Sequence, residues 1–256
     1  MELFCRISGN GPPLIILHGL LGMSDNWHSL ATDLSQHYTV YIPDLRNHGQ
    51  SPHSAQFDYE YMLNDLVDII DKNEITKPFI IGHSMGGKLA MLFALRFPGI
   101  TERLVVVDIH PGKYRADVSM LHMIETMRSM NLSDFNSFAD AEQFLLSHVS
   151  NPVLVQLILK NIRRDENKKL IWKPDIHSIY KNLSAITEAV GNELSSDVPA
   201  LFIRGSKSAY ITTSDHTTLL MKFPAAVIQT IEDAGHWVHA DKPAEFLAAV
   251  KYFLKK

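Results

Sequence analysis

One short segment constrains the fold of this chain more than any other. The apolar run Pro78–Ile81 leads directly into Gly82-His83-Ser84-Met85-Gly86-Gly87, and a helical pattern follows over residues 85–97. A buried strand that enters G-x-S-x-G and leaves as a helix is the sequence form of a nucleophile elbow. The turn holds its serine in a strained conformation, and the flanking glycines remove side chains that would clash. The segment therefore names one reactive atom, the Ser84 hydroxyl oxygen.

The chain on both sides of this segment alternates between strand and helix patterns. Fully apolar strands in such an alternation predict a mostly parallel sheet of about seven strands, covered by helices on both faces. Helical patterns lie near residues 26–35, 59–72, 85–97 and 243–254. The candidate strands are Leu3–Ile7, Leu14–Leu17, Thr39–Ile42, Phe79–Gly82, Leu104–Val107, Ala200–Arg204 and Val227–Ile231.

A long insertion interrupts this alternation. Only helical patterns are visible from about residue 113 to residue 194, including a helix start at Asn151-Pro152. We therefore predict an α/β core formed by residues 1–112 and 195–256, with a helical cap over residues 113–194. The insertion follows the carboxyl end of a sheet strand, where ligands bind in open α/β sheets. The cap is expected to cover the site.

The bulk composition narrows the class of protein. The 256 residues are 46% hydrophobic and 20% charged, which is ordinary for a globular chain. A formal net charge of −4 gives no electrostatic reason to bind nucleic acid or an anionic membrane. Cys5 is the only cysteine, so no internal disulfide is possible. With no signal peptide and no apolar stretch of membrane-spanning length, a cytoplasmic location is expected. No oligomeric state is predicted.

A serine hydroxyl needs a base before it can act as a nucleophile. His236 follows the last predicted strand, Val227–Ile231, and precedes the terminal helix. This is the chain order in which an elbow serine meets its histidine. We predict that His236 takes the proton from Ser84.

The tetrahedral intermediate of acyl transfer needs two backbone N–H donors aimed at its oxyanion. Met85, directly after the nucleophile, is expected to supply one donor. Leu20 is expected to supply the other, because His18-Gly19-Leu20-Leu21-Gly22 follows an early strand and its glycines allow close backbone approach.

Four motifs together resemble the α/β-hydrolase superfamily over essentially the whole chain. They are residues 12–19 (PPLIILHG), 44–52 (DLRNHGQSP), 82–88 (GHSMGGK) and 235–243 (GHWVHADKP). The Arg-Asn-His-Gly and Gly-Gly-Lys variants are similar to those of the YbfF-type bacterial esterases and their mitochondrial relatives. This resemblance implies hydrolysis of carboxylic esters and, in some members, of acyl-CoA thioesters. No role is predicted for Lys88.

The acid of the predicted triad departs from the common pattern. Most of the superfamily carries an Asp where this chain has Ser208, and serine has no charge to stabilise an imidazolium. Asp108 ends the preceding core strand, and adjacent strand ends lie about 4.8 Å apart. We therefore assign Asp108 to orient His236. The YbfF-type resemblance also implies Asp108 as the acid, with Ser208 as a fourth member that hydrogen-bonds within the pair.

Three other acids have simpler explanations. Asp215 is expected at a helix N-terminus, Asp241 is expected to cap the last helix, and Asp233 would share a loop with the histidine ring.

The cap carries four methionines, Met120, Met123, Met127 and Met130, at spacings that place them on one helix face. They pack the cap onto the core or line an acyl pocket, for which Phe135, Phe138, Trp172 and Trp237 are further candidates. The basic pairs at 163–164 and 168–169 are a solvated face or a contact for an anionic head group. His236 and His239 have the spacing of a metal pair but no third ligand, so no metal is expected.

The leading prediction is a serine hydrolase that cleaves esters or thioesters without any cofactor. Dehalogenases and epoxide hydrolases place an Asp at the elbow, which Ser84 argues against. Carbon–carbon bond hydrolases and a related lyase keep the serine, but generally keep the acid where Ser208 stands. A non-catalytic ligand-binding protein on the same scaffold is the alternative from a different class.

Overall fold

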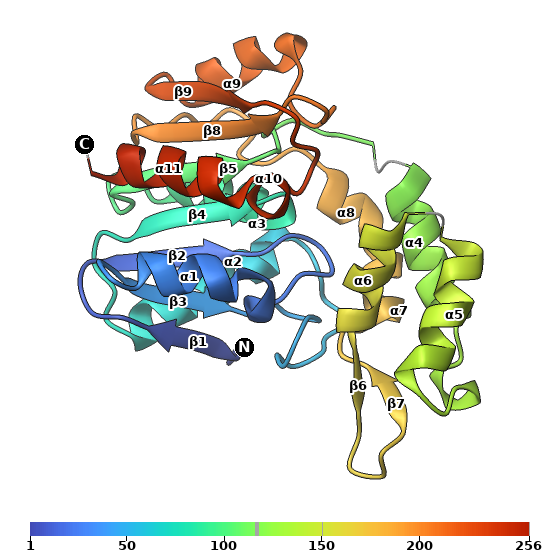
Figure 1. Ribbon diagram of the computed structural model, residues 1–256. Coiled ribbons are helices and arrows are strands. Elements are labelled where there is room, and N and C mark those ends of the chain that lie inside the picture. The colour runs from blue at the N-terminus through green and yellow to red at the C-terminus, as the bar shows by residue number, and fades with distance from the viewer. Residues whose placement is uncertain (116–117, 150, 256) are drawn as a thin grey trace.

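The computed structural model describes residues 1–115, 118–149 and 151–255. Within them, seven strands form one sheet in the order β1-β3-β2-β4-β5-β8-β9 (Figure 1). Every neighbouring pair is parallel except β1 with β3, which confirms the predicted fold class. The strands are β1 (Cys5–Ser8), β2 (Pro13–Leu17), β3 (Thr39–Pro43), β4 (Phe79–His83), β5 (Arg103–Val107), β8 (Ala200–Gly205) and β9 (Ala226–Ile231).

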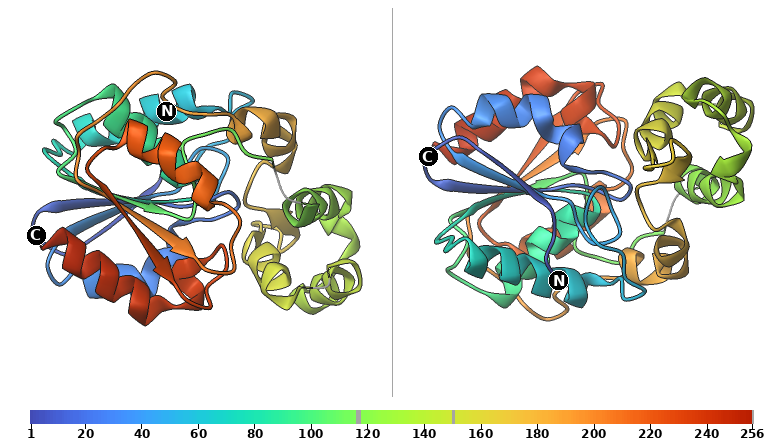
Figure 2. Two further views of the ribbon diagram at one scale, coloured as in Figure 1. Left: turned by 90° about the horizontal axis from the view of Figure 1, so that it is seen from above. Right: turned by 90° about the horizontal axis from the view of Figure 1, so that it is seen from below.

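Helices cover both faces of this sheet (Figure 2). Leu14 and Ile16 of β2 belong to the cluster that faces α1 and α11, whereas Ile15 and Leu17 belong to the cluster that faces α2 and α3. Because successive strand residues point to opposite faces, a strand buried on both sides must be apolar throughout. The helices are α1 (His28–Leu34) and α11 (Pro243–Leu254) on one face, and α2 (Tyr59–Lys72), α3 (Met85–Arg96) and α9 (His216–Lys222) on the other.

The residues between β5 and β8 form the cap, which lies at one end of the sheet (Figure 1). The prediction that it is wholly helical is wrong, because β6 (Ile162–Arg164) and β7 (Leu170–Trp172) pair as an antiparallel hairpin. Each strand has three residues, too few to produce a readable alternation of polar and apolar side chains. The cap helices are α4 (Val118–Ser129), α5 (Phe138–His148), α6 (Pro152–Lys160), α7 (Ile176–Lys181) and α8 (Leu183–Thr187). The cap limits at residues 112 and 195 stay a prediction.

Two predicted helix starts have different outcomes. Asn151 caps α6 as predicted, because its side chain accepts a hydrogen bond from Val153 N–H at 2.9 Å. The prediction that Asp241 caps the last helix is wrong: Lys242 occupies that position, and Asp241 accepts a hydrogen bond from Gly235 N–H at 2.8 Å. Asp241 therefore shapes the loop that carries His236.

Lys88, for which no role was predicted, is buried in the first turn of α3, directly after the elbow. Its ammonium donates to the carbonyl oxygen of Gly112 at 2.7 Å and to that of Glu188. These residues lie on the two connections between core and cap. Burial lowers the pKa of Lys88 to about 7. A lysine on the core thus joins both connections of the cap.

Among the described residues, no helix is both long enough and apolar enough to cross a bilayer.

Candidate active site

The elbow holds Ser84 as the sequence predicts. Ser84 has a φ of +51°, and its N–H donates to Val107 O at 3.0 Å. A Cβ on Gly86 would lie 2.3 Å from Leu17 O, and one on Gly82 would lie 2.4 Å from Gly86 O. Both positions therefore exclude any larger residue, because backbone atoms cannot move aside. The serine is fixed between β4 and α3 with its side chain in a cavity.

His236 lies beside Ser84, although 152 positions separate them in sequence. Its Nε2 is 3.0 Å from Ser84 Oγ. The ring stacks on Tyr210, with ring centroids 4.0 Å apart. His83 Nε2 donates to the backbone oxygen of His236 at 3.0 Å. Tyr210, two residues beyond Ser208, thus supports the imidazole, a role that no sequence motif indicates.

Asp108 contacts the far side of the imidazole. Its Oδ2 is 2.8 Å from His236 Nδ1, and it also accepts a hydrogen bond from the Ser208 hydroxyl. Its Oδ1 accepts from Gly205 N–H at 3.0 Å. The carboxylate is fully buried, and the Asp108 backbone has a φ of +52°. Both oxygens are thus held, and one of them faces the histidine.

The other candidate acids are engaged elsewhere. Asp233 forms an exposed ion pair with Lys207 at 2.9 Å. Asp215 accepts from Thr212 N–H at 2.7 Å at the start of a helical turn, as predicted. Neither carboxylate contacts His236 in the described structure.

The two predicted oxyanion donors flank Ser84 in different ways. Met85 is the first residue of α3, where backbone N–H groups have no acceptor within the helix. Leu20 lines the cavity from the loop after β2. His18 fixes that loop, because its Nδ1 donates to Gly19 O at 2.8 Å and its Nε2 accepts from Leu45 N–H at 2.9 Å. A Cβ on Gly19 would meet the His83 ring at 2.7 Å, so this approach requires glycine.

We call the cavity of about 240 Å³ beside Ser84 the nucleophile cavity. Of the predicted pocket residues, Met120, Met123 and Trp237 line it, together with Leu154 and Tyr210. The walls are mainly apolar, and the cap contributes α4 and α6. This arrangement suits an apolar part of a small molecule, bound between core and cap.

Met127 and Trp172 do not line this cavity. They lie together at another hollow, with His53 and Pro174. Met127 is seven residues beyond Met120 on α4, a distance of about 10 Å along a helix axis, so it shares the face but not the cavity. Phe135 packs on Phe144, and Phe138 lies beneath the Arg164 guanidinium. The prediction that Met127 and Trp172 line the site is therefore wrong.

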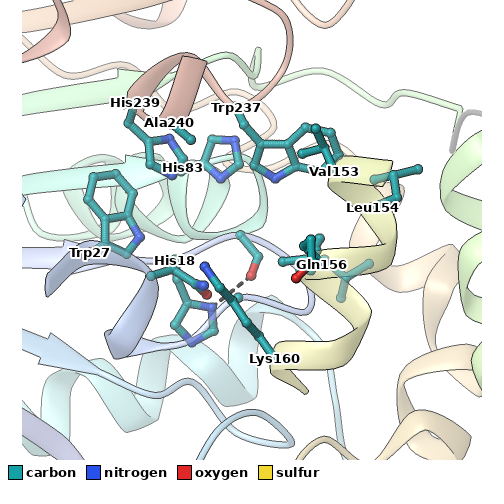
Figure 3. A pocket seen from close by; sticks show the side chains of 15 residues that line it. His18, Trp27, His83, Val153, Leu154, Gln156, Lys160, Trp237, His239 and Ala240 are labelled. Carbon is teal, nitrogen blue, oxygen red and sulfur yellow. Dashed lines mark hydrogen bonds between the residues drawn. The ribbon is translucent and has the colours of Figure 1, made fainter. Parts of the chain in front are cut away.

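A second cavity, of about 180 Å³, adjoins the first (Figure 3). The two share Leu20, His83, Leu154 and Trp237 as lining residues. In Figure 3, Trp27 and His239 lie on one side, and the α6 side chains Val153, Gln156 and Lys160 lie on the other. Ser84 and His236 line only the first cavity. We call the second one the side cavity.

The histidines around the side cavity are uncharged at neutral pH. Burial lowers the pKa of His18 to about 4 and that of His239 to about 3. Burial also holds the pKa of His83 well below its usual range. His239, the second half of the apparent metal pair, stacks flat on Trp27 with centroids 4.2 Å apart. Among the described residues, no group of three or more His, Cys, Asp or Glu side chains could hold a metal ion.

Comparisons with known proteins agree with this fold. The family model for the alpha/beta hydrolase fold matches residues 12–243. The chain belongs to the α/β-hydrolase family.

Its relatives include named esterases and lipases. It is 40% identical to "sn-1-specific diacylglycerol lipase ABHD11" of Danio rerio, over 96% of this chain and 80% of that protein. It is 33% identical to "Esterase YbfF" of Escherichia coli (strain K12), over 96% of this chain and 94% of that protein. The solved structure of a "Marine microorganism esterase" is 41% identical and superimposes with a TM-score of 0.95, covering 98% of this chain and 99% of that one. The predicted resemblance to YbfF-type esterases is confirmed.

Proposed function

We propose that this protein is a serine hydrolase that cleaves carboxylic esters or acyl thioesters through an acyl-enzyme intermediate. One observation carries the proposal: His236 Nε2 is 3.0 Å from Ser84 Oγ, and His236 Nδ1 is 2.8 Å from Asp108 Oδ2. These distances are those of a nucleophile, its base and the group that orients the base. The esterase and lipase names of its relatives support ester hydrolysis as the class of reaction.

The first half-reaction forms the acyl-enzyme. Ser84 Oγ attacks the carbonyl carbon while His236 Nε2 takes the hydroxyl proton, and buried Asp108 stabilises the resulting imidazolium. The N–H groups of Leu20 and Met85 bind the oxyanion. When the intermediate collapses, the bond from carbon to the leaving oxygen or sulfur breaks, and His236 gives its proton to that atom.

The second half-reaction releases the acid. A water molecule gives a proton to His236 Nε2 and attacks the acyl carbon. The bond between carbon and Ser84 Oγ then breaks, and the proton returns to the serine. An ester and a thioester present the same carbonyl to Ser84, so both substrate classes fit this mechanism.

A fluorophosphonate probe combined with a turnover assay tests the proposal. We expect one probe molecule per chain, attached at Ser84, and hydrolysis of p-nitrophenyl acetate and butyrate. Ser84→Ala should abolish labelling and lower kcat by about 10⁴-fold or more, because the nucleophile is lost. An acyl-CoA series beside the p-nitrophenyl esters measures the preference for thioesters.

Folded protein that neither labels nor turns over any of these substrates would contradict the proposal and favour a ligand-binding role. Labelling at a residue other than Ser84 would contradict the assignment of the nucleophile.

A further inference from the structure

The side cavity is lined by a lysine that the mechanism does not use. Lys160 is the only Lys, Arg, Asp or Glu among the described residues that line it. The three histidines in the lining are neutral at pH 7, because burial lowers the pKa of each. No Asp or Glu occurs among the described residues that line the cavity. Lys160 makes no ion pair with any residue that the structure describes.

The rest of the side cavity is apolar near the nucleophile and polar near solvent. Leu20, Leu154 and Trp237 form the wall shared with the nucleophile cavity. Lys160 and Gln156 are both exposed and project from α6 at the other side (Figure 3). A molecule that extends from Ser84 into the side cavity therefore meets apolar surface first and a cation afterwards.

The position of His236 decides which half of a substrate extends there. The leaving group must stay close to His236 Nε2 to receive its proton. His236 lines the nucleophile cavity and not the side cavity. The acyl substituent is therefore the part that passes Leu20 and Trp237 into the side cavity.

We propose that the side cavity is an acyl subsite for chains that end in an anionic group, with Lys160 as the residue that selects the anion. This inference rests on the function proposed above. The fitting substrates are monoesters or monothioesters of aliphatic dicarboxylic acids, whose free carboxylate would pair with the Lys160 ammonium. The apolar walls would enclose the methylene chain between the two carbonyl groups.

Matched pairs of esters test the proposal, with kcat/KM measured by pH-stat titration. Monomethyl adipate is compared with methyl hexanoate, and monomethyl suberate with methyl octanoate, because each pair differs only in the terminal carboxylate. We expect Lys160→Met to lower the preference for the anionic member about three- to tenfold, and Lys160→Glu to lower it further. About 1 M salt should reduce the same preference in the unmodified protein.

Lys181→Met is the matched control, because Lys181 is an exposed cap lysine at the end of α7 and lines neither cavity. It removes the same charge and should leave the preference unchanged. A second control moves the anion to the leaving group, comparing 4-(butyryloxy)butanoate with butyl butyrate. Lys160 variants should not alter that ratio.

The inference is overturned if Lys160→Met changes anionic and neutral acyl chains equally, or if its effect falls on the leaving-group pair. Either result leaves the proposed function standing, provided that the neutral esters are hydrolysed. Failure to hydrolyse any ester, neutral or anionic, would instead contradict the proposed function itself.

Discussion

The carboxyl ends of β5 and β8 are neighbours with opposite chemistry. The strands run parallel with Val107 paired to Ile203, so their following loops emerge side by side. The β5 end supplies a carboxylate, Asp108, whereas the β8 end supplies the Ser208 hydroxyl. The Ser208 hydroxyl donates to Asp108 Oδ2, and the same oxygen contacts His236 Nδ1. An acid can therefore contact one imidazole from either of two adjacent strands, because the sheet register brings both strand ends within reach.

The β8 end still supports the imidazole without carrying an acid. Gly205 N–H and the Ser208 hydroxyl both donate to Asp108, and Tyr210 stacks on the His236 ring. These two donors hold both oxygens of the buried carboxylate. The loop after β8 therefore holds Asp108 in place. Most members of the superfamily are expected to carry the acid itself on this loop.

Exchanging the side chains of Asp108 and Ser208 tests whether the two strand ends are equivalent, and its first step should have the largest effect on kcat. Asp108→Ser alone should lower kcat about 10⁴-fold, since the imidazolium loses its stabilising charge. Adding Ser208→Asp should recover at least about a hundredfold of that loss, because the new carboxylate starts from the position that now contacts Asp108. The measurement is kcat with p-nitrophenyl butyrate, with circular dichroism as the control for folding. A double variant no faster than Asp108→Ser would show that the two strand ends are not interchangeable.

Removing only the Ser208 hydroxyl should have a smaller effect on kcat. Ser208→Ala deletes one of the donors to Asp108 and leaves the contact with His236 intact. We expect kcat to fall about tenfold, in line with the loss of a single hydrogen bond to a charged group. Ser208→Thr keeps a hydroxyl and is the matched control, expected to lose less. A loss as large as that of Asp108→Ser would mean that Ser208 has a greater role than support.

Buried histidines that lack a carboxylate partner should make the protein less stable below neutral pH. His236 has a carboxylate, but His18 and His239 are buried without one, and their pKa values are lowered to about 4 and about 3. Below pH about 6.5 they bind protons in the unfolded chain and not in the folded one, so folding stability falls as pH falls toward 3. Urea unfolding should give a free energy about 1 to 3 kcal/mol lower at pH 5.5 than at pH 7.5.

The His239→Phe variant tests whether a buried histidine causes this pH dependence. His239→Phe keeps a ring that can stack on Trp27 and removes a titrating group whose Nδ1 has no hydrogen-bond partner within the described structure. The pH dependence of unfolding should become shallower in this variant. An unchanged slope, or a stability that does not fall below pH 6.5 in the parent, would contradict the assignment of neutral buried histidines.

The sheet and its connections could be predicted from sequence because their signals are strong. β2, β4 and β5 are buried on both faces, so their residues form unbroken apolar runs that few other structures require. The order of Ser84 and His236 along the chain, together with the adjacency of two strand ends, sufficed to predict that Asp108 lies near His236. Each of these inferences depends on backbone geometry that many sequences share.

The structure of the cap was harder to predict from the sequence, because its sequence patterns are weak or ambiguous. The strands of the β6–β7 hairpin are too short for an alternation, and the basic pair Arg163-Arg164 obscures it further. Helical periodicity placed Met127 on the right face of α4, yet it cannot say where along the axis a cavity ends. Tyr210 and Lys88 reach their contacts through tertiary packing, for which the sequence offers no local pattern.

The most direct test of the account is the kcat of Asp108→Asn. The amide keeps the shape of the carboxylate but donates a hydrogen bond toward His236 Nδ1, which favours the imidazole tautomer that cannot accept the Ser84 proton. With p-nitrophenyl butyrate at neutral pH, we expect a fall of about 10⁴-fold in a protein that unfolds at the same urea concentration as the parent. A kcat within about tenfold of the parent would contradict the assignment of Asp108 as the acid that orients His236.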